Sequence, residues 1–262
     1  MNDFRKNAIV TGATGAIGTA IARQLAVKGF DVTIIARNEQ KALKTVNEIQ
    51  TSSKNHNVSF LLADLSVKSS IQQLASNWER PLHVLINNAA VTPRTREETN
   101  EGIELQWATN VLGYFWMINC FTPFLKMAAP ARVVNVASYW AGDLDISDLE
   151  CKRRRYDNDM IYRQSKQANR MLTIVFAEKL KPFGITVNAV HPGDVNSTLS
   201  NNLGYGGFQT PDQGADTPVW AATQPELTDI TGKYFERREE TTCQFASNKP
   251  LAYKLFEICE RY

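Results

Sequence analysis

The sequence NAIVTGATGAIG, residues 7–18, runs from an apolar segment through a glycine-rich turn into the start of an amphipathic segment. The turn TGATGAIG spaces its glycines as Gly12-x-x-Gly15-x-x-Gly18, which differs from the GxGxxG pattern of the common dinucleotide fingerprint. Such a turn at the start of a helix lets the backbone approach a phosphate and directs N–H groups toward it. A tight strand-to-helix connection would also select glycine, so the turn alone leaves both interpretations open.

Short apolar runs alternate with longer amphipathic stretches along the rest of the chain. Residues 16–30, for example, form a helical pattern that Gly29 can end. Strands rich in Val, Ile and Leu that are separated by helices predict a parallel sheet covered on both faces. We therefore predict a single doubly wound α/β domain over residues 1–262, with about seven strands and ligands at their carboxyl ends. The strand candidates are residues 7–12, 31–36, 58–64, 82–90, 131–138 and 184–192.

Charge and cysteine content exclude several classes of function. The formal net charge is only +2, so we expect no nucleic-acid binding, and the basic cluster at residues 152–155 is interpreted as a solvated loop. Cysteines and histidines are scattered and form no CxxC pair, which indicates reduced thiols and no metal site. These residues are Cys120, Cys151, Cys243 and Cys259 with His56, His83 and His191.

Membrane segments are not expected. The strand pattern begins within six residues of the N-terminus, which leaves no room for a signal peptide or anchor, so we expect a cytoplasmic protein. Residues 105–125 carry no charge, but they include polar side chains such as Gln106 and Asn119 that lipid would leave unsatisfied. A helix buried in the protein, at a subunit contact for instance, is the better interpretation.

Polar residues follow several of the predicted strands. Asp64 could accept a hydrogen bond from an adenine amine or could cap the next helix, a role for which Ser66 is equally placed. Asn87 and Asn88 need partners, so at least one of them ties strands together or contacts a ligand. Ser138 would project its hydroxyl over the carboxyl edge of the sheet.

The stretch MIYRQSKQANRM, residues 160–171, places Tyr162 and Lys166 four positions apart on one face of a predicted helix. One such pair can arise by chance in a chain with eight tyrosines. The position of the pair after Ser138 favours a functional role, because a strand-end hydroxyl, a phenol and an ammonium can then converge beside a nucleotide at Gly12–Gly18. A positive charge held near the phenol would lower its pKa.

Together these motifs resemble the short-chain dehydrogenase/reductase family, over nearly the whole chain from about residue 4. Within the family, the chain resembles the retinol-dehydrogenase-like and WW-domain-oxidoreductase-like branch. The resemblance implies a Rossmann-type fold and a nicotinamide cofactor. It rests on TGATGAIG (11–18), ADL (63–65), NNAA (87–90), Asn110, Ser138, YRQSK (162–166) and HPGDVNST (191–198), and for the branch on Asp148-Leu149, SKQAN, GADTPVW and GKYF.

The resemblance also assigns roles to residues. Tyr162 would be the general acid that protonates a carbonyl oxygen and the base in reverse, while Lys166 would lower its pKa and hold the nicotinamide ribose. Ser138 would bind the substrate oxygen, and Asn110 would hold a water that links Lys166 to solvent. The middle glycine of the turn lies one place earlier than is usual in the branch, with Ala16 after it.

The expected cofactor is NADP(H). The second strand closes into Arg37 and Asn38 without a carboxylate at residues 36–38, and arginine suits a 2′-phosphate, although Glu39 could pair with Arg37 and soften the preference. Arg37 could alternatively begin a solvated helix. The expected cofactor-binding residues are Gly12, Thr14, Gly15, Ala16, Ile17, Gly18, Arg37, Asn38, Asp64, Leu65, Asn87, Ala89, Tyr162, Lys166, Pro192, Gly193, Val195 and Ser197.

The predicted function is reversible conversion of a carbonyl compound, of lipophilic character, into an alcohol. An insertion at 139–159 and a loop at 193–215 would determine specificity, with Trp140, Tyr205 and Phe208 either forming an apolar wall or packing. The alternative is a catalytically weak NADP(H)-binding regulatory protein of the same fold. A homodimer or homotetramer is also expected, because the helices at 105–125 and 159–181 would otherwise expose large apolar patches.

Overall fold

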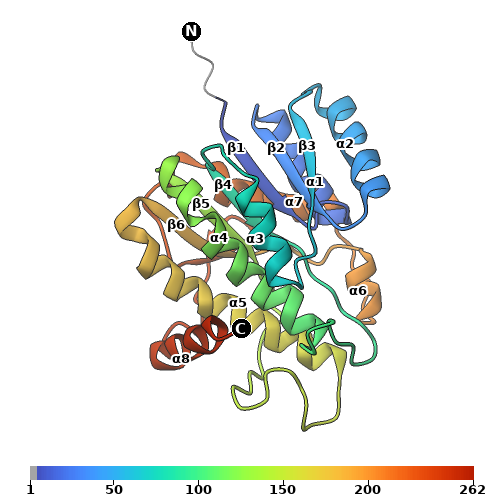
Figure 1. Ribbon diagram of the computed structural model, residues 1–262, viewed down its shortest axis with the longest axis vertical. Helices are drawn as coiled ribbons and strands as arrows, with labels where there is room; N and C mark the ends of the chain where they lie inside the picture. The colour runs from blue at the N-terminus through green and yellow to red at the C-terminus, as the bar shows by residue number, and fades with distance from the viewer. Residues whose placement is uncertain (1–4) are drawn as a thin grey trace.

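The computed structural model describes residues 5–262 and contains one eight-stranded sheet in the order β3-β2-β1-β4-β5-β6-β7-β8 (Figure 1). All neighbouring strands are parallel except β8, which runs antiparallel to β7. The predicted doubly wound fold is therefore confirmed. The strands are β1 Asn7–Thr11, β2 Asp31–Ala36, β3 Val58–Leu62, β4 Val84–Asn87, β5 Ala131–Val136, β6 Ile185–His191, β7 Tyr234–Glu236 and β8 Glu239–Glu240.

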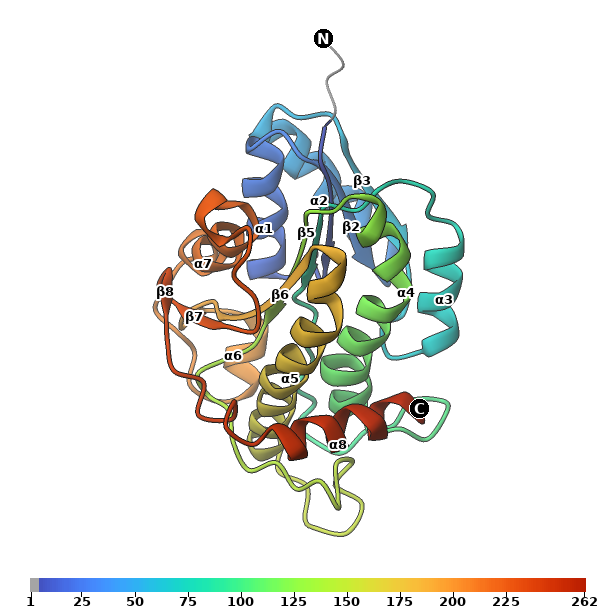
Figure 2. The same cartoon turned by 90° about the vertical axis from the view of Figure 1, so that its left-hand side faces the viewer.

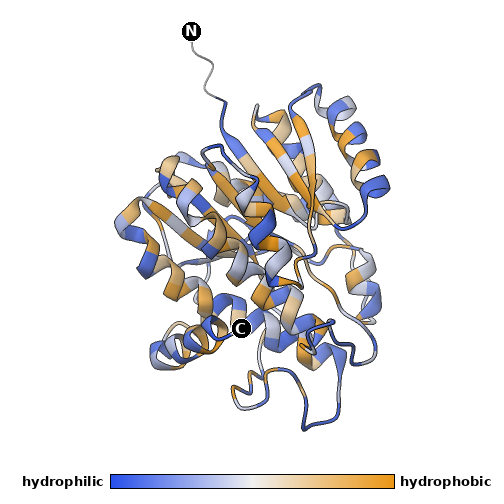
Figure 3. Cartoon of the chain, viewed as in Figure 1, coloured by the Kyte–Doolittle hydropathy of each residue, from blue (hydrophilic) through white to orange (hydrophobic). Residues whose placement is uncertain are grey.

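Helices cover both faces of the sheet, as Figure 2 shows with the sheet between two helical layers. One layer holds α1 (Ala16–Val27), α2 (Glu39–Ser53) and α7 (Pro211–Thr223); the other holds α3 (Lys68–Ser76), α4 (Gly113–Met127) and α5 (Asn158–Leu180). Both faces of the sheet are consequently apolar, and the central strands are coloured mostly as hydrophobic in Figure 3. The expectation that the chain has no signal peptide or anchor depends partly on residues 1–4. These residues lie outside the described part of the chain.

The register of the central strands explains why the polar strand ends meet. Val10 of β1 pairs with Ile34 of β2 and with Ile86 of β4, so the three strands end at the same level. The residues that follow these strands begin with the glycine-rich turn, Arg37 and Asn88. Parallel pairing thus gathers groups that are far apart in the sequence along one edge of the sheet.

The uncharged segment at 105–125 is buried, as predicted. It forms a π-helical stretch, Trp107–Leu112, that continues into α4. One face of α4, from Tyr114 to Phe121 and Leu125, is buried against the sheet and α5. No helix among residues 5–262 is long and apolar enough to span a membrane.

The C-terminal helix α8 (Lys249–Glu260) lies across α4 and α5 (Figure 2). Phe256 of α8 packs on Phe115 of α4 and on Phe176 of α5, with ring centroids 4.9 and 5.0 Å apart. The apolar surface that motivated the expected homo-oligomer is therefore covered within the chain at this place. The predicted subunit contact through the helices at 105–125 and 159–181 stays a prediction.

Two local expectations need correction, and the predicted loop at the basic cluster is confirmed. Neither Asp64 nor Ser66 caps α3, because the N-cap residue is Val67 and Asp64 instead accepts hydrogen bonds from Ser66. The predicted substrate loop at 193–215 is partly helical: it contains α6 (Thr198–Asn202) and the first turn of α7. In the insertion at 139–159, the Asp148 carboxylate accepts backbone N–H groups of the basic cluster, which orders that loop.

Candidate functional site

A cavity of about 330 Å³ lies at the carboxyl edge of β1, β2 and β4, against the start of α1. Its floor is backbone: a Cβ on Gly12, whose φ is +64°, would lie 2.6 Å from Cα of Ala89. A Cβ on Gly18 would lie too close to the Gly12 carbonyl oxygen, so α1 packs directly on the turn. The interpretation of the turn as a tight strand-to-helix connection is thus confirmed, and its phosphate-binding role stays a prediction.

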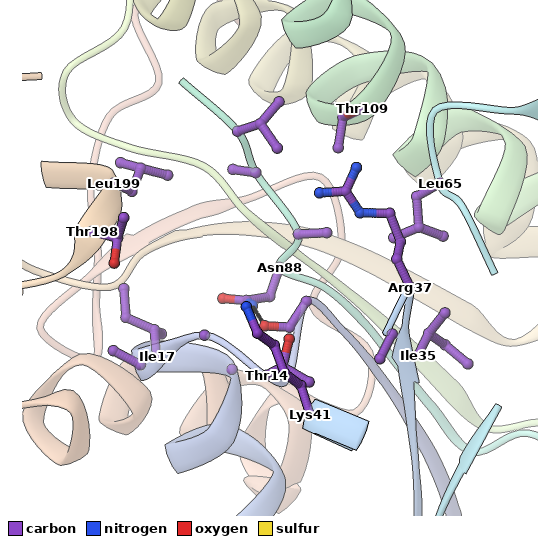
Figure 4. A pocket seen from close by; sticks show the side chains of 18 of the residues that line it. Thr14, Ile17, Ile35, Arg37, Lys41, Leu65, Asn88, Thr109, Thr198 and Leu199 are labelled. Carbon is purple, nitrogen blue, oxygen red and sulfur yellow. Dashed lines mark hydrogen bonds between the residues drawn. The ribbon is translucent and has the colours of Figure 1, made fainter. Parts of the chain in front are cut away.

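Figure 4 shows two cationic side chains in this cavity, Arg37 from the end of β2 and Lys41 from the first turn of α2. Both side chains are exposed, and no ion pair between Arg37 and Glu39 is found in the described part of the chain. Asn38 does not line the cavity. Its side chain caps α2 by accepting the Lys41 N–H at 2.9 Å, so the role expected for it is replaced by a structural one.

Asn87 and Asn88, the two amides at the end of β4, have different roles. Asn87 is fully buried and donates to Oδ1 of Asn135 at 3.0 Å, which ties β4 to β5 and removes Asn87 from the cavity. Asn88 donates through Nδ2 to the Thr11 carbonyl and lines the cavity (Figure 4). Asp64 lies on the cavity wall as expected. The sequence alone did not show which of the two amides ties the strands together and which faces the cavity.

A second, smaller cavity of about 70 Å³ adjoins the first and holds the expected catalytic groups. The two cavities share Ile17, Asn88 and Ser197 as lining residues, so they form one continuous cleft. Tyr162 lies in the second turn of α5, which begins after Asp157 caps the helix by accepting the Met160 N–H. Ser138 and Tyr162 both line this cavity, and the Ser138 hydroxyl acts to lower the pKa of Tyr162.

Lys166 lies one turn after Tyr162 and is almost completely buried. Its Nζ donates to the Val136 carbonyl oxygen at 2.9 Å and lies 5.5 Å from the centre of the Tyr162 ring. Tyr114 donates its hydroxyl to the same carbonyl at 3.3 Å. The geometry therefore brings Ser138, Tyr162 and Lys166 together, as the sequence predicted.

The electrostatics differ from the expectation. Burial raises the pKa of Tyr162, with the Tyr205 phenol adding to the rise and the hydrogen bond from Ser138 opposing it. Burial also lowers the pKa of Lys166 to about 7. The prediction that Lys166 lowers the pKa of Tyr162 is thus not met in this geometry, because desolvation outweighs any attraction between phenolate and ammonium.

Asn110 lies outside both cavities. Its side chain is fully buried and binds the backbone of Val91 twice, accepting the N–H at 2.8 Å and donating to the carbonyl at 3.1 Å. It therefore fixes the strand-end loop after β4 against the π-helical stretch. Its expected role in holding a water stays a prediction.

The remaining expected residues fall along the cleft. Pro192, Gly193 and Val195 line the smaller cavity, and Ser197 lines both while also capping α6 through the Ser200 N–H. Sequence reasoning missed Lys41, although its place four residues after Arg37 on a predicted helix was a usable signal. It also missed lining residues without such a signal: Ala63, Ala90, Thr109, Thr198 and Leu199.

Two further observations limit the chemistry. Among residues 5–262, no group of three His, Cys, Asp or Glu side chains is placed to hold a metal ion. The four cysteines are unpaired thiols. The cleft thus offers hydroxyls, one amine, backbone N–H groups and two exposed cations, which suit a phosphate-bearing cofactor and proton transfer to an oxygen.

Residues 6–205 match the family model for short chain dehydrogenases, so the chain belongs to this family of oxidoreductases, which use nicotinamide cofactors. Within it, the chain belongs to the retinol-dehydrogenase-like branch. It is 36% identical to a polyprenol dehydrogenase of Homo sapiens (97% of this chain, 84% of that protein) and 35% identical to retinol dehydrogenase 12 of Mus musculus (97% and 85%). An uncharacterized protein from Mycobacterium paratuberculosis shares the fold, with a TM-score of 0.82, 26% identity and 98% and 93% of the two chains covered.

Proposed function

We propose that this protein is an NADP(H)-dependent oxidoreductase that interconverts a ketone or aldehyde and the corresponding alcohol. One observation carries the proposal: Ser138, Tyr162 and Lys166 line one cavity, and this cavity adjoins the one at the glycine-rich turn. Hydroxyls so placed can bind and protonate one oxygen atom. The relatives named as retinol and polyprenol dehydrogenases act on alcohols by name, which agrees with this reaction class.

The residues would divide the chemistry as follows. Ser138 and Tyr162 donate hydrogen bonds to the carbonyl oxygen, and Tyr162 transfers its proton to that oxygen as the alcohol forms. Burial raises the pKa of Tyr162, so the phenol holds its proton at neutral pH and can donate it to the carbonyl oxygen. The nicotinamide group supplies or accepts the hydride when bound.

Cofactor choice rests on Arg37 and Lys41. Both side chains line the large cavity near the end of β2, where the adenine ribose binds in dinucleotide folds. An arginine fork and an ammonium together suit a 2′-phosphate better than a 2′-hydroxyl. We therefore propose a preference for NADP(H) over NAD(H).

A panel of aldehydes, ketones, quinones and secondary alcohols tests the function, with NADPH absorbance at 340 nm as the readout and NADPH binding measured by fluorescence on the same preparation. We expect both tight binding and turnover for at least one carbonyl class. Binding without turnover across the panel would favour the alternative, a regulatory NADP(H)-binding protein. Absence of binding would contradict both.

A further inference from the structure

Three aromatic side chains stand half-exposed at the mouth of the smaller cavity. Tyr139, Trp140 and Tyr205 are 45%, 39% and 48% exposed, and all three line the cavity that contains Ser138 and Tyr162. The Trp140 and Tyr205 ring centroids lie 6.3 Å apart, although Trp140 follows β5 and Tyr205 follows α6. Two segments distant in sequence thus supply one aromatic wall, formed by Trp140 and Tyr205.

The wall is held in place by other contacts. Trp140 donates its Nε1–H to Asp159 at 2.8 Å, and the Arg163 guanidinium lies 5.3 Å from its ring centre. The backbone N–H of Tyr205 binds the Ser200 carbonyl at 3.2 Å. Rings fixed before a ligand arrives lose little freedom on binding, so their exposed surface is available for stacking. Phe208, by contrast, is 84% exposed and does not line the cavity.

Charged groups contact the Trp140 side of the wall. Arg163 forms an ion pair with Asp143 at 2.8 Å, and Asp159 accepts the Trp140 hydrogen bond at the same rim. The cavity itself is small, about 70 Å³, and this volume suits a compact substrate.

We propose that Trp140 and Tyr205 select a compact substrate whose carbonyl carbon is attached to an aromatic or conjugated ring. The carbonyl oxygen lies at Ser138 and Tyr162, and the ring packs against the wall through offset or edge contacts. This inference rests on the proposed function and narrows its substrate class. It separates this protein from relatives whose names specify retinol or polyprenol, both long isoprenoid alcohols.

The test compares kcat/KM with NADPH for benzaldehyde and cyclohexanecarbaldehyde, which have the same number of carbon atoms but differ in ring aromaticity. The ratio of the two values is measured in wild type and in Trp140→Leu and Tyr205→Leu, because comparing ratios cancels the intrinsic reactivities of the aldehydes. Tyr205→Phe keeps the ring and serves as the matched control, and Phe208→Ala removes an exposed ring outside the cavity. All-trans-retinal is assayed as the long substrate, and NADPH binding shows that each variant is folded.

We expect the aromatic-to-saturated ratio to fall about three- to tenfold in each leucine variant and to stay unchanged in both controls. We also expect kcat/KM for retinal to lie at least tenfold below that for benzaldehyde. An unchanged ratio in both leucine variants, or retinal as the better substrate, would overturn the inference while leaving the proposed reaction intact. Absence of turnover with every carbonyl compound would instead overturn the proposed function.

Discussion

Backbone shapes the cavity beside the glycine-rich turn, whereas side chains shape the cavity beside Tyr162. On the nucleotide side, Gly12 and Gly18 bring backbone atoms so close together that no Cβ would fit, and parallel strand pairing fixes their level. On the substrate side, Trp140 and Tyr205 come from loops and meet through ring contacts and hydrogen bonds.

Because of this difference, we expect the two cavities to respond differently to substitutions. Backbone-built surfaces bind what every member of a class shares, such as a diphosphate, and they fail when a methyl group is added. Side-chain-built surfaces bind what differs among substrates, and substitution changes their selectivity before it changes their stability. The proposed chemistry lies where the two cavities adjoin, at Tyr162 and Lys166.

The largest effect, on turnover, is expected for Tyr162→Phe. This substitution removes one hydroxyl where the two cavities adjoin and leaves the walls of both cavities in place. Turnover should fall by about a hundredfold or more, the usual contribution of positioned acid–base catalysis, while NADPH affinity stays within about threefold. Tyr156→Phe removes a partly buried phenol that binds Gln106 outside the smaller cavity, and serves as the control. Steady-state kinetics and NADPH fluorescence report the two quantities, and retained turnover would remove Tyr162 as proton donor.

The next effect concerns the buried amine of Lys166, whose pKa of about 7 lies below its ordinary value of 10.5 because of burial. Between pH 7 and pH 10 the unfolded chain binds this proton and the folded chain releases it, so folding stability rises with pH in that window. Compared with Lys166→Met, which carries no proton there, wild type should gain up to about 4 kcal/mol between these pH values.

Urea denaturation of both proteins without cofactor, at four pH values from 7 to 10, measures this gain. Tyr162 remains in both proteins, so its raised pKa largely cancels in the difference. If the stability difference does not change with pH, the amine keeps its proton throughout and the folded pKa is not lowered.

A pair of glycine substitutions tests the contrast between the two surfaces directly. Gly18→Ala places a methyl group against the Gly12 carbonyl and the Asn88 amide, so we expect about 1–3 kcal/mol of lost stability together with weaker NADPH binding. Gly204→Ala, in the loop that carries Tyr205, meets no atom within 4 Å and costs only the strain of its φ of +90°, about 1 kcal/mol. Thermal unfolding and NADPH titration should show weakened cofactor binding for Gly18→Ala alone; equal weakening in both would contradict the contrast.

The same contrast explains how much the sequence could predict. Six strands and their parallel orientation could be predicted from apolar runs that alternate with helical periods. Strands buried on both faces are rich in apolar residues, and the sequence shows this directly. The short strands β7 and β8 were not predicted, because segments of three and two residues are too short to show a strand pattern. The placement of Ser138, Tyr162 and Lys166 in one cavity was predictable because they follow predictable elements, one at a strand end and two on a helix face.

What the sequence could not predict depends on contacts between distant segments. The packing of α8 over α4 and α5 was missed, because an apolar helix face does not specify its partner. The pairing of Trp140 with Tyr205 depends on two irregular loops and was left undecided for the same reason. The pKa of Tyr162 was predicted in the wrong direction, since the extent of burial is a property of the folded structure.

The smallest effect is expected at the cationic end of the nucleotide surface, the one place where that surface relies on side chains. Arg37→Ala and Lys41→Ala should each weaken NADPH binding about tenfold and leave NADH binding nearly unchanged, because each removes one partner of a 2′-phosphate. Arg37→Asp should act more strongly, since it adds repulsion. Lys44→Ala is the matched control: it removes an exposed cation of α2 that pairs with Glu48 and does not line the cavity. Because both cations are exposed, higher ionic strength should narrow the preference for NADPH in wild type more than in the alanine variants. Titration of both cofactors at two salt concentrations measures these effects, and equal affinity of wild type for NADPH and NADH would show that Arg37 and Lys41 only begin a solvated helix.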